Sequence, residues 1–213
     1  MDNKKEQLEA IQDIRALMER SSRFLSLSGL AGIAIGIVAI VGILAAYLYM
    51  GIAPNSEPAY YTLALNEYGE ANGPLYTFLM ADFILVLITA LILGVYFSLR
   101  KAKKQGLPTW DATAKRLLIN LALPLVAGGI YCLILLYHGH LALVVPATLI
   151  FYGLALLNAS KYTINDIRYL GILEIVIGLM ASFFIGYGLL FWVLGFGVLH
   201  IVYGITIYFK YEQ

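Results

Sequence analysis

The chain has 213 residues, of which 61% are hydrophobic and only 13% are charged. A soluble globular domain carries about 25% charged residues, so this composition argues against a soluble domain and indicates that lipid covers much of the surface. The net charge of +1 gives no basis for nucleic-acid binding, and the single cysteine, Cys132, excludes an internal disulfide. The length suits one unit, so residues 1–213 are expected to form a single membrane domain.

Residues 3–22 are expected to form a cytoplasmic amphipathic helix, because Leu8, Ile11, Ile14 and Met18 recur at spacings of three and four. The segment carries acids as well as bases, which is not typical of a cleavable signal peptide. Such a helix can rest on the membrane surface. It can also dock onto a protein partner or onto a second copy of the chain, and both interpretations stay open.

Six apolar runs follow this segment. A bilayer core of about 30 Å needs about 20 apolar residues per helix, and lipid offers no partner for open backbone groups. The expected fold class is therefore all-α, a polytopic membrane bundle of six transmembrane helices. The expected spans are residues 25–50, 75–99, 117–137, 141–157, 169–186 and 189–209. Short turns at residues 138–140 and 186–188 predict that spans three and four, and spans five and six, form antiparallel hairpins.

Every Lys and Arg falls on one side of this six-span arrangement. These residues precede the first span, lie between spans two and three and between spans four and five, and follow the sixth span. The positive-inside rule assigns that side to the cytoplasm. Both termini are therefore expected in the cytoplasm.

Ionisable side chains inside the hydrocarbon are costly, so each is a candidate functional residue. Three stand out, namely Asp82 in the second span, Glu174 in the fifth and His200 in the sixth. Glu174 and His200 lie equally far from Tyr187 at the centre of the turn, so a regular hairpin places them at the same depth. Such a pair can relay a proton or hold a ligand, or its hydrogen bond can simply pin two helices together.

Each of these candidates has an alternative partner. Arg168 lies near Glu174 on the same helix and could pair with it instead. Tyr131 of the third span lies at a depth similar to that of Asp82 and could donate a hydrogen bond to it. Asp82 could also be reached by water from the outside, or it could mark a site that opens outward.

Three further patterns have both a simple and a functional interpretation. The basic cluster Arg100, Lys101, Lys103 and Lys104 either sets the topology alone or contacts anionic lipid headgroups. The pair Gly32 and Gly36 permits close helix packing, either within the bundle or in a homo-oligomer. His138 and His140 are weak candidates for metal ligands, and solvated interfacial histidines are the simpler interpretation.

Residues 14–42 read IRALMERSSRFLSLSGLAGIAIGIVAIVG. This stretch resembles the start of a set of small bacterial integral membrane proteins with no assigned activity. The resemblance implies the bacterial inner membrane as the location. It implies no catalytic residue.

The sequence contains no phosphate-binding loop, no nucleophile elbow and no Cys/His metal pair, so no cofactor and no catalytic residue are expected. The favoured function is a non-enzymatic binding, sensing or accessory protein. The first alternative is a small carrier or channel for a proton, an ion or a small molecule that uses Asp82 or the pair Glu174 and His200. The second alternative is an intramembrane lipid-modifying enzyme.

Overall fold

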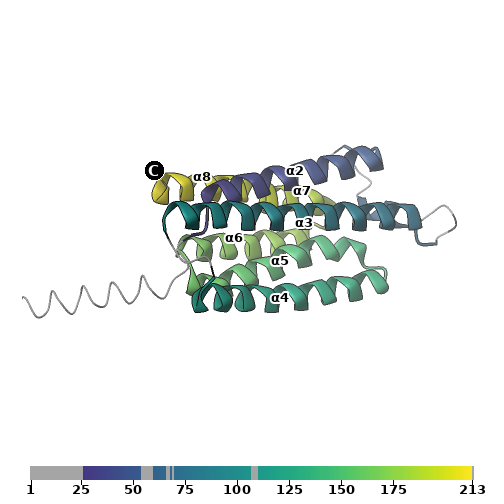
Figure 1. Ribbon diagram of the computed structural model, residues 1–213. Helices are drawn as coiled ribbons and strands as arrows, with labels where there is room; N and C mark the ends of the chain where they lie inside the picture. Colours follow the sequence, from purple (N-terminus) through teal and green to yellow (C-terminus); the bar gives the residue numbers. More distant parts are fainter. Residues whose placement is uncertain (1–25, 54–59, 66–67, 69, 107–109, 213) are drawn as a thin grey trace, which may run out of the picture.

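The computed structural model describes residues 26–53, 60–65, 68, 70–106 and 110–212. Within these residues the chain is helical and forms no strand beyond an isolated bridge between Leu65 and Ala71. The long helices run along a common direction (Figure 1). They are α2 (Gly29–Met50), α3 (Gly73–Lys104), α4 (Ala112–Tyr137), α5 (Leu141–Ala159), α6 (Asp166–Phe183) and, after the short α7 (Gly188–Trp192) and a π-helical segment (Val193–Leu199), α8 (His200–Tyr211).

Five helical stretches in the described part of the chain are long and apolar enough to cross a membrane. They are Gly29–Met50, Gly73–Lys104, Ala112–Tyr137, Leu141–Tyr162 and Ile185–Tyr211. The prediction of an all-α membrane protein is therefore confirmed in its class. The fifth predicted span corresponds to α6, which is not among the five and whose 18 residues include Asp166, Arg168 and Glu174. The amphipathic helix predicted at residues 3–22 lies outside the described residues.

Capping residues extend two helices beyond their predicted apolar limits. Asn72 begins α3, because its side-chain oxygen accepts a hydrogen bond from the N–H of Leu75 at 3.3 Å. Asp111 begins α4 in the same way, because it accepts from the N–H of Ala114 at 2.7 Å. Hydropathy locates the hydrocarbon part of a helix, whereas local capping decides where the helix starts.

The contacts between helices divide the bundle into two groups of three. In the first group α2 packs between α3 and α8, and in the second α5 packs between α4 and α6. The two groups meet where α6 packs against α8 and the π-helical segment, and where α5 packs against α7. Both α3 and α4 therefore occupy outer positions, and the most apolar part of α3 contains no buried residue.

Glycines allow α2 and the last helix to approach closely. A Cβ atom on Gly204 would lie 2.5 Å from the backbone nitrogen of Ile33, and one on Gly32 would lie 2.9 Å from the Cα of Gly204. A Cβ atom on Gly36 would lie 2.6 Å from the carbonyl oxygen of Gly197. The close helix packing that Gly32 and Gly36 permit therefore occurs between helices of the same chain.

Glu212 ties three helix ends together. Its carboxylate accepts hydrogen bonds from the N–H of Gly29 at 2.5 Å and from the hydroxyl of Ser28 at 3.3 Å. The Lys101 ammonium lies 3.4 Å from the same carboxylate and donates to the carbonyl oxygen of Leu27 at 2.7 Å. The end of the chain therefore caps the start of α2 and holds the last turn of α3 beside it.

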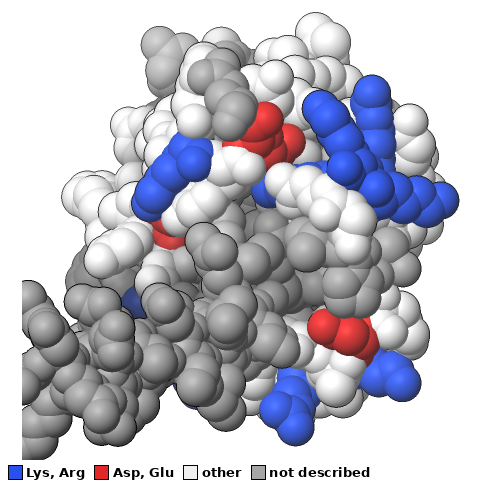
Figure 2. All heavy atoms as spheres, turned by 60° about the vertical axis from the view of Figure 1, so that its left-hand side comes forward, with Lys and Arg blue, Asp and Glu red and all other residues white. Residues whose placement is uncertain are grey.

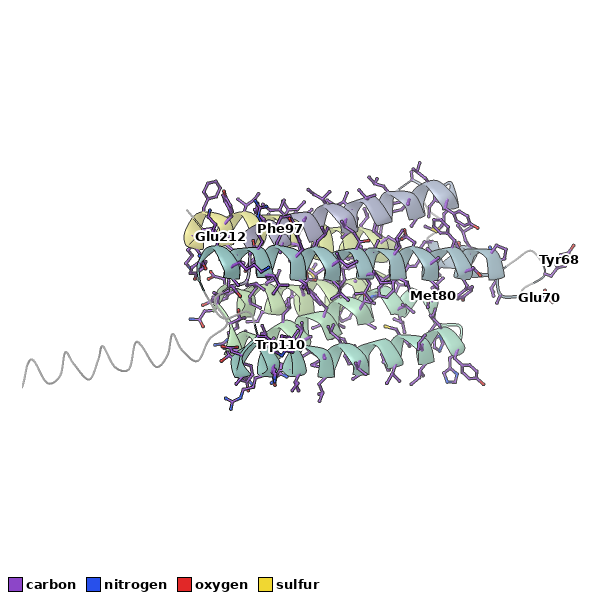
Figure 3. All side chains as sticks on the ribbon, viewed as in Figure 1. Tyr68, Glu70, Met80, Phe97, Trp110 and Glu212 are labelled. Atoms are coloured by element: carbon purple, nitrogen blue, oxygen red, sulfur yellow. The ribbon has the colours of Figure 1, made fainter. Side chains whose placement is uncertain are left out.

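Every described Lys and Arg lies at this same end of the bundle, where α3, α5 and α8 end and where α4 and α6 begin. Figure 2 shows this face, with the basic side chains in separate groups and a few acidic side chains close to them. Figure 3 places Glu212 at this end, and Tyr68 and Glu70 at the opposite end. The two ends of the bundle thus differ in charge.

Candidate functional site

Glu174 of α6 and His200, the first residue of α8, meet in the interior of the bundle. Their exposed fractions are 0% and 4%, and Oε1 of the glutamate lies 3.5 Å from Nδ1 of the imidazole. The equal distances of the two residues from Tyr187 predict that they lie level. The structure shows in addition that they face each other.

Two other groups hold the imidazole ring of His200. Its Nδ1 lies 3.1 Å from the carbonyl oxygen of Gly195, and its Nε2 lies 2.7 Å from the hydroxyl oxygen of Tyr152. A carbonyl oxygen only accepts hydrogen bonds, so Nδ1 is assigned the proton. In the neutral ring Nε2 then accepts from the Tyr152 hydroxyl. One imidazole thereby joins α5 to the π-helical segment.

The π-helical segment contributes Gly195, which contacts both His200 and Glu174. Gly195 precedes His200 by five positions, which is the spacing of residues joined across a π-helical turn. A Cβ atom on Gly195 would lie 2.5 Å from Oε2 of Glu174 and 2.5 Å from Cδ2 of Leu149. The absence of a side chain at Gly195 therefore makes room for the carboxyl group.

Glu174 is the least satisfied member of the cluster. Among the described residues neither of its oxygen atoms has a hydrogen-bond partner, and the Nδ1–H of His200 is directed to the Gly195 carbonyl. A bare carboxylate in such a site is costly, and a proton on the carboxyl or on the imidazole relieves that cost. The arrangement can hold a proton and can hold helices together, and it contains no Ser, Thr, Cys or Lys side chain.

The two ionisable side chains of this cluster, Glu174 and His200, are buried. Tyr152, which is itself only partly buried, covers the far side of the imidazole ring. An apolar groove of about 340 Å³ lies at the hairpin turn itself, lined by Phe184, Tyr187, Leu190, Phe191 and Leu194. None of the cluster residues lines this groove, so it does not lead to the carboxyl group.

Tyr152 is the functional residue that reasoning from the sequence missed. Most tyrosines of the chain lie near the expected ends of the spans, whereas Tyr152 lies inside the fourth one. A hydroxyl group inside hydrocarbon needs a hydrogen-bond partner. The interior position of Tyr152 is therefore the signal that could have identified it.

The other polar candidates are not brought into this cluster. Asp82 is half-buried on α3, beside Gly42 of α2. The ring of Tyr131 packs against Phe151, with the ring centres 5.7 Å apart, and donates no hydrogen bond to Asp82. Arg168 is exposed and makes no ion pair with Glu174.

The basic cluster predicted to contact lipid headgroups divides into two parts. Arg100, Lys103 and Lys104 are exposed at the end of α3. Lys101 is only 7% exposed, because its ammonium group is held by Leu27 and Glu212. Lys101 therefore stabilises the helix ends, and the other three residues are free to contact a headgroup layer.

His138 and His140 lie at the exposed turn between α4 and α5, where Gly139 takes a φ of +75°. Within the described residues no group of three or more His, Cys, Asp or Glu side chains is placed to hold a metal ion. The two histidines stay weak candidates for metal ligands.

Comparison of the chain with family models, with curated proteins and with solved structures found no match. The resemblance of residues 14–42 to small bacterial membrane proteins therefore stays a prediction.

Proposed function

We propose that this chain is a six-span integral membrane protein that binds a partner within or beside the membrane and catalyses no reaction. The observation that carries this proposal is the burial of Glu174 and His200. A carrier or an enzyme that used Glu174 and His200 would need water or substrate to reach this pair, whereas Glu174 is 0% exposed. The cluster instead serves as a polar contact between α5, α6 and the last helix, as interhelical hydrogen bonds do in other membrane proteins.

In this proposal α6 also crosses the membrane, which brings the number of spans to six. Its 18 residues cover about 27 Å at 1.5 Å per residue, which is close to the hydrocarbon thickness. The inward orientation of Glu174 removes the main objection to placing α6 in lipid. The end of the bundle that carries the described Lys and Arg residues faces the cytoplasm by the positive-inside rule. The bacterial inner membrane is proposed from the resemblance of residues 14–42.

Surface-labelling of single cysteines tests this topology. In a Cys132→Ser background, H138C is expected to react with an impermeant maleimide in intact cells, because His138 is exposed at the turn between α4 and α5. K103C, at the opposite end, is expected to react only after the membrane is made permeable. Labelling of both positions in intact cells would overturn the proposed orientation.

Copurification tests the binding role. The full chain is extracted from its native membranes in mild detergent as the wild type, as E174Q, and with residues 3–22 removed. A membrane partner in fixed ratio to both the wild type and E174Q supports the proposal, and loss of that partner in the shortened chain would assign the contact to residues 3–22. A chain that always runs alone, or an ion flux in vesicles that E174Q abolishes, would refute it.

A further inference from the structure

Asp82 is a carboxyl group on a helix that has a single long neighbour. It lies on the stripe of α3 that faces α2, where a Cβ atom on Gly42 would come within 3.5 Å of its Oδ2. Within the described part of the chain, Asp82 has no hydrogen-bond or ion-pair partner. The contact with α2 therefore provides space for the carboxyl group but no donor.

The depth of Asp82 makes this lack of a donor costly. Gly42 lies eight residues before the end of α2 at Met50, so the carboxyl group beside it lies about 12 Å below that end at 1.5 Å per residue. Figure 3 shows the neighbouring Met80 on the half of α3 that leads to Tyr68 and Glu70, far from Glu212. Ionisable groups at such depth are normally paired or directed into a protein interior.

Among the described residues, no Lys or Arg supplies the missing group. Every described Lys and Arg lies at the opposite end of the bundle, and Lys101 is already bound by Leu27 and Glu212. His200 is bound by Gly195 and Tyr152. None of these described cations is therefore placed to pair with Asp82, and a cation from another molecule could do so.

An exposed face of two helices borders Asp82. Helical spacing places the most exposed residues of α2 and α3 on the same side of this helix pair, the side away from α8. Each of six apolar residues on this face is at least half exposed, namely Val41, Leu44, Leu48, Leu85, Ile88 and Ile92.

We propose that this α2–α3 face binds a transmembrane helix of a partner protein, and that a Lys or Arg of that helix pairs with Asp82. The proposal rests on the binding role proposed above and specifies the site and the chemistry of the partner. Charge complementarity selects this occupant. A second copy docked through the same face would bring another carboxyl group and no described Lys or Arg to Asp82.

Model peptides of known sequence test the proposal with the full chain. The chain is placed in phosphatidylcholine vesicles with a photo-crosslinking residue at Leu85, and separately at Leu123 of α4, which is also highly exposed but has no carboxyl group beside it. One transmembrane peptide contains only leucine and alanine, and a second carries a single Lys one third of the way along. The uncharged lipid removes attraction by the surface.

The Lys peptide is expected to crosslink at Leu85 about 3- to 30-fold more than the apolar peptide, which corresponds to one interhelical polar contact. At Leu123 the two peptides are expected to crosslink equally. D82L is expected to abolish the preference at Leu85 and D82N to weaken it, with unchanged elution of the purified chain.

Equal crosslinking of both peptides at Leu85 would overturn the proposal, since Asp82 would then be satisfied by water from the outside. Crosslinking between two copies of the chain at Leu85, whichever peptide is present, would overturn it in favour of a homodimer. Neither result would contradict the binding role itself, which copurification of the wild-type chain tests independently.

Discussion

The carboxyl group of Glu174 and the imidazole of His200 lie 3.5 Å apart, yet the hydrogen bonds of the ring go to other groups. Nδ1 is directed to the Gly195 carbonyl and Nε2 to the Tyr152 hydroxyl, while both carboxyl oxygens are left without a partner. His200 is thus the bridge of the cluster, and Glu174 is its least satisfied member. Substitutions at the two positions should have different costs.

We expect E174Q to change the free energy of unfolding by less than about 1 kcal/mol, because the substitution keeps the volume and breaks no hydrogen bond. H200A removes a buried ring and leaves the Tyr152 hydroxyl and the Gly195 carbonyl unpaired, so we expect a loss of about 2–4 kcal/mol. Unfolding of the detergent-solubilised chain, followed by circular dichroism, measures both changes. An equal loss in the two variants would show instead that an ionised pair holds the site together.

Y152F removes only the hydroxyl that donates to Nε2 of His200, and we expect a loss of about 1–3 kcal/mol from the unpaired nitrogen. Y131F is the matched control, because Tyr131 is 45% exposed and its ring contact with Phe151 survives the change. The same unfolding measurement compares the two. A separate readout is the ¹⁵N chemical shift of the His200 ring, which should move in Y152F and stay constant in Y131F.

The helices of this fold could be predicted from the sequence because long apolar runs in lipid allow few other structures. The limits of the runs were less predictable. The first span was expected to begin at Leu25, whereas α2 begins at Gly29, where the distant Glu212 caps it. The last span was expected to be one regular helix, whereas it contains a π-helical turn from Val193 to Leu199. Both differences depend on tertiary contacts that no local pattern reveals.

The candidate site, too, could be predicted only in part. Depth can be read from the sequence, since equal distances from the turn at Tyr187 placed Glu174 and His200 level. The rotation of each helix cannot be read in this way, so neither the third member, Tyr152, nor the isolation of Asp82 from Tyr131 could be predicted. Lys101 was grouped with its exposed neighbours for a related reason. A helix turns by about 100° per residue, so Lys101 is buried beside Glu212 while Lys103, two residues further along, stays exposed.

Gly204 should tolerate no side chain. In G204A the new methyl group would lie 2.5 Å from the backbone nitrogen of Ile33, so α2 and α8 must separate. We expect a loss of about 1–3 kcal/mol, as for other overpacked interiors. G129A is the control, because a Cβ atom at Gly129 of α4 meets nothing within 4 Å. Alanine favours helix over glycine by about 1 kcal/mol, so G129A should be neutral or stabilising, and equal losses would contradict the close approach.

Lys101 should contribute to stability more than its neighbours on α3. K101M leaves the carbonyl oxygen of Leu27 unpaired and removes the cation from Glu212, so we expect a loss of about 1–3 kcal/mol. K103M changes an exposed lysine two residues further along α3 and should have little effect. Thermal unfolding of the two variants in the same detergent gives the comparison. An equal response would show that Lys101 is solvated in the membrane-embedded protein.

Tyr60 provides a test at alkaline pH. Its side chain is 3% exposed, its hydroxyl donates to the carbonyl oxygen of Ala142 at 3.2 Å, and burial raises the pKa of Tyr60 above the ordinary value of a tyrosine. A raised pKa means that the folded chain keeps a proton that the unfolded chain releases. The stability contributed by Tyr60 is therefore fully present below about pH 10 and decreases as the pH rises above it.

We accordingly expect Y60F to be less stable than the wild type by about 1 kcal/mol at neutral pH, the value of one neutral hydrogen bond. This difference should shrink as the pH rises past about 10, because only the wild type loses stability through ionisation at position 60. Unfolding midpoints of both chains across the alkaline range measure the difference. Y137F, which deletes a hydroxyl that is 87% exposed, is the control for removal of a surface tyrosine. A difference between Y60F and the wild type that stays constant with pH would show that Tyr60 is solvated.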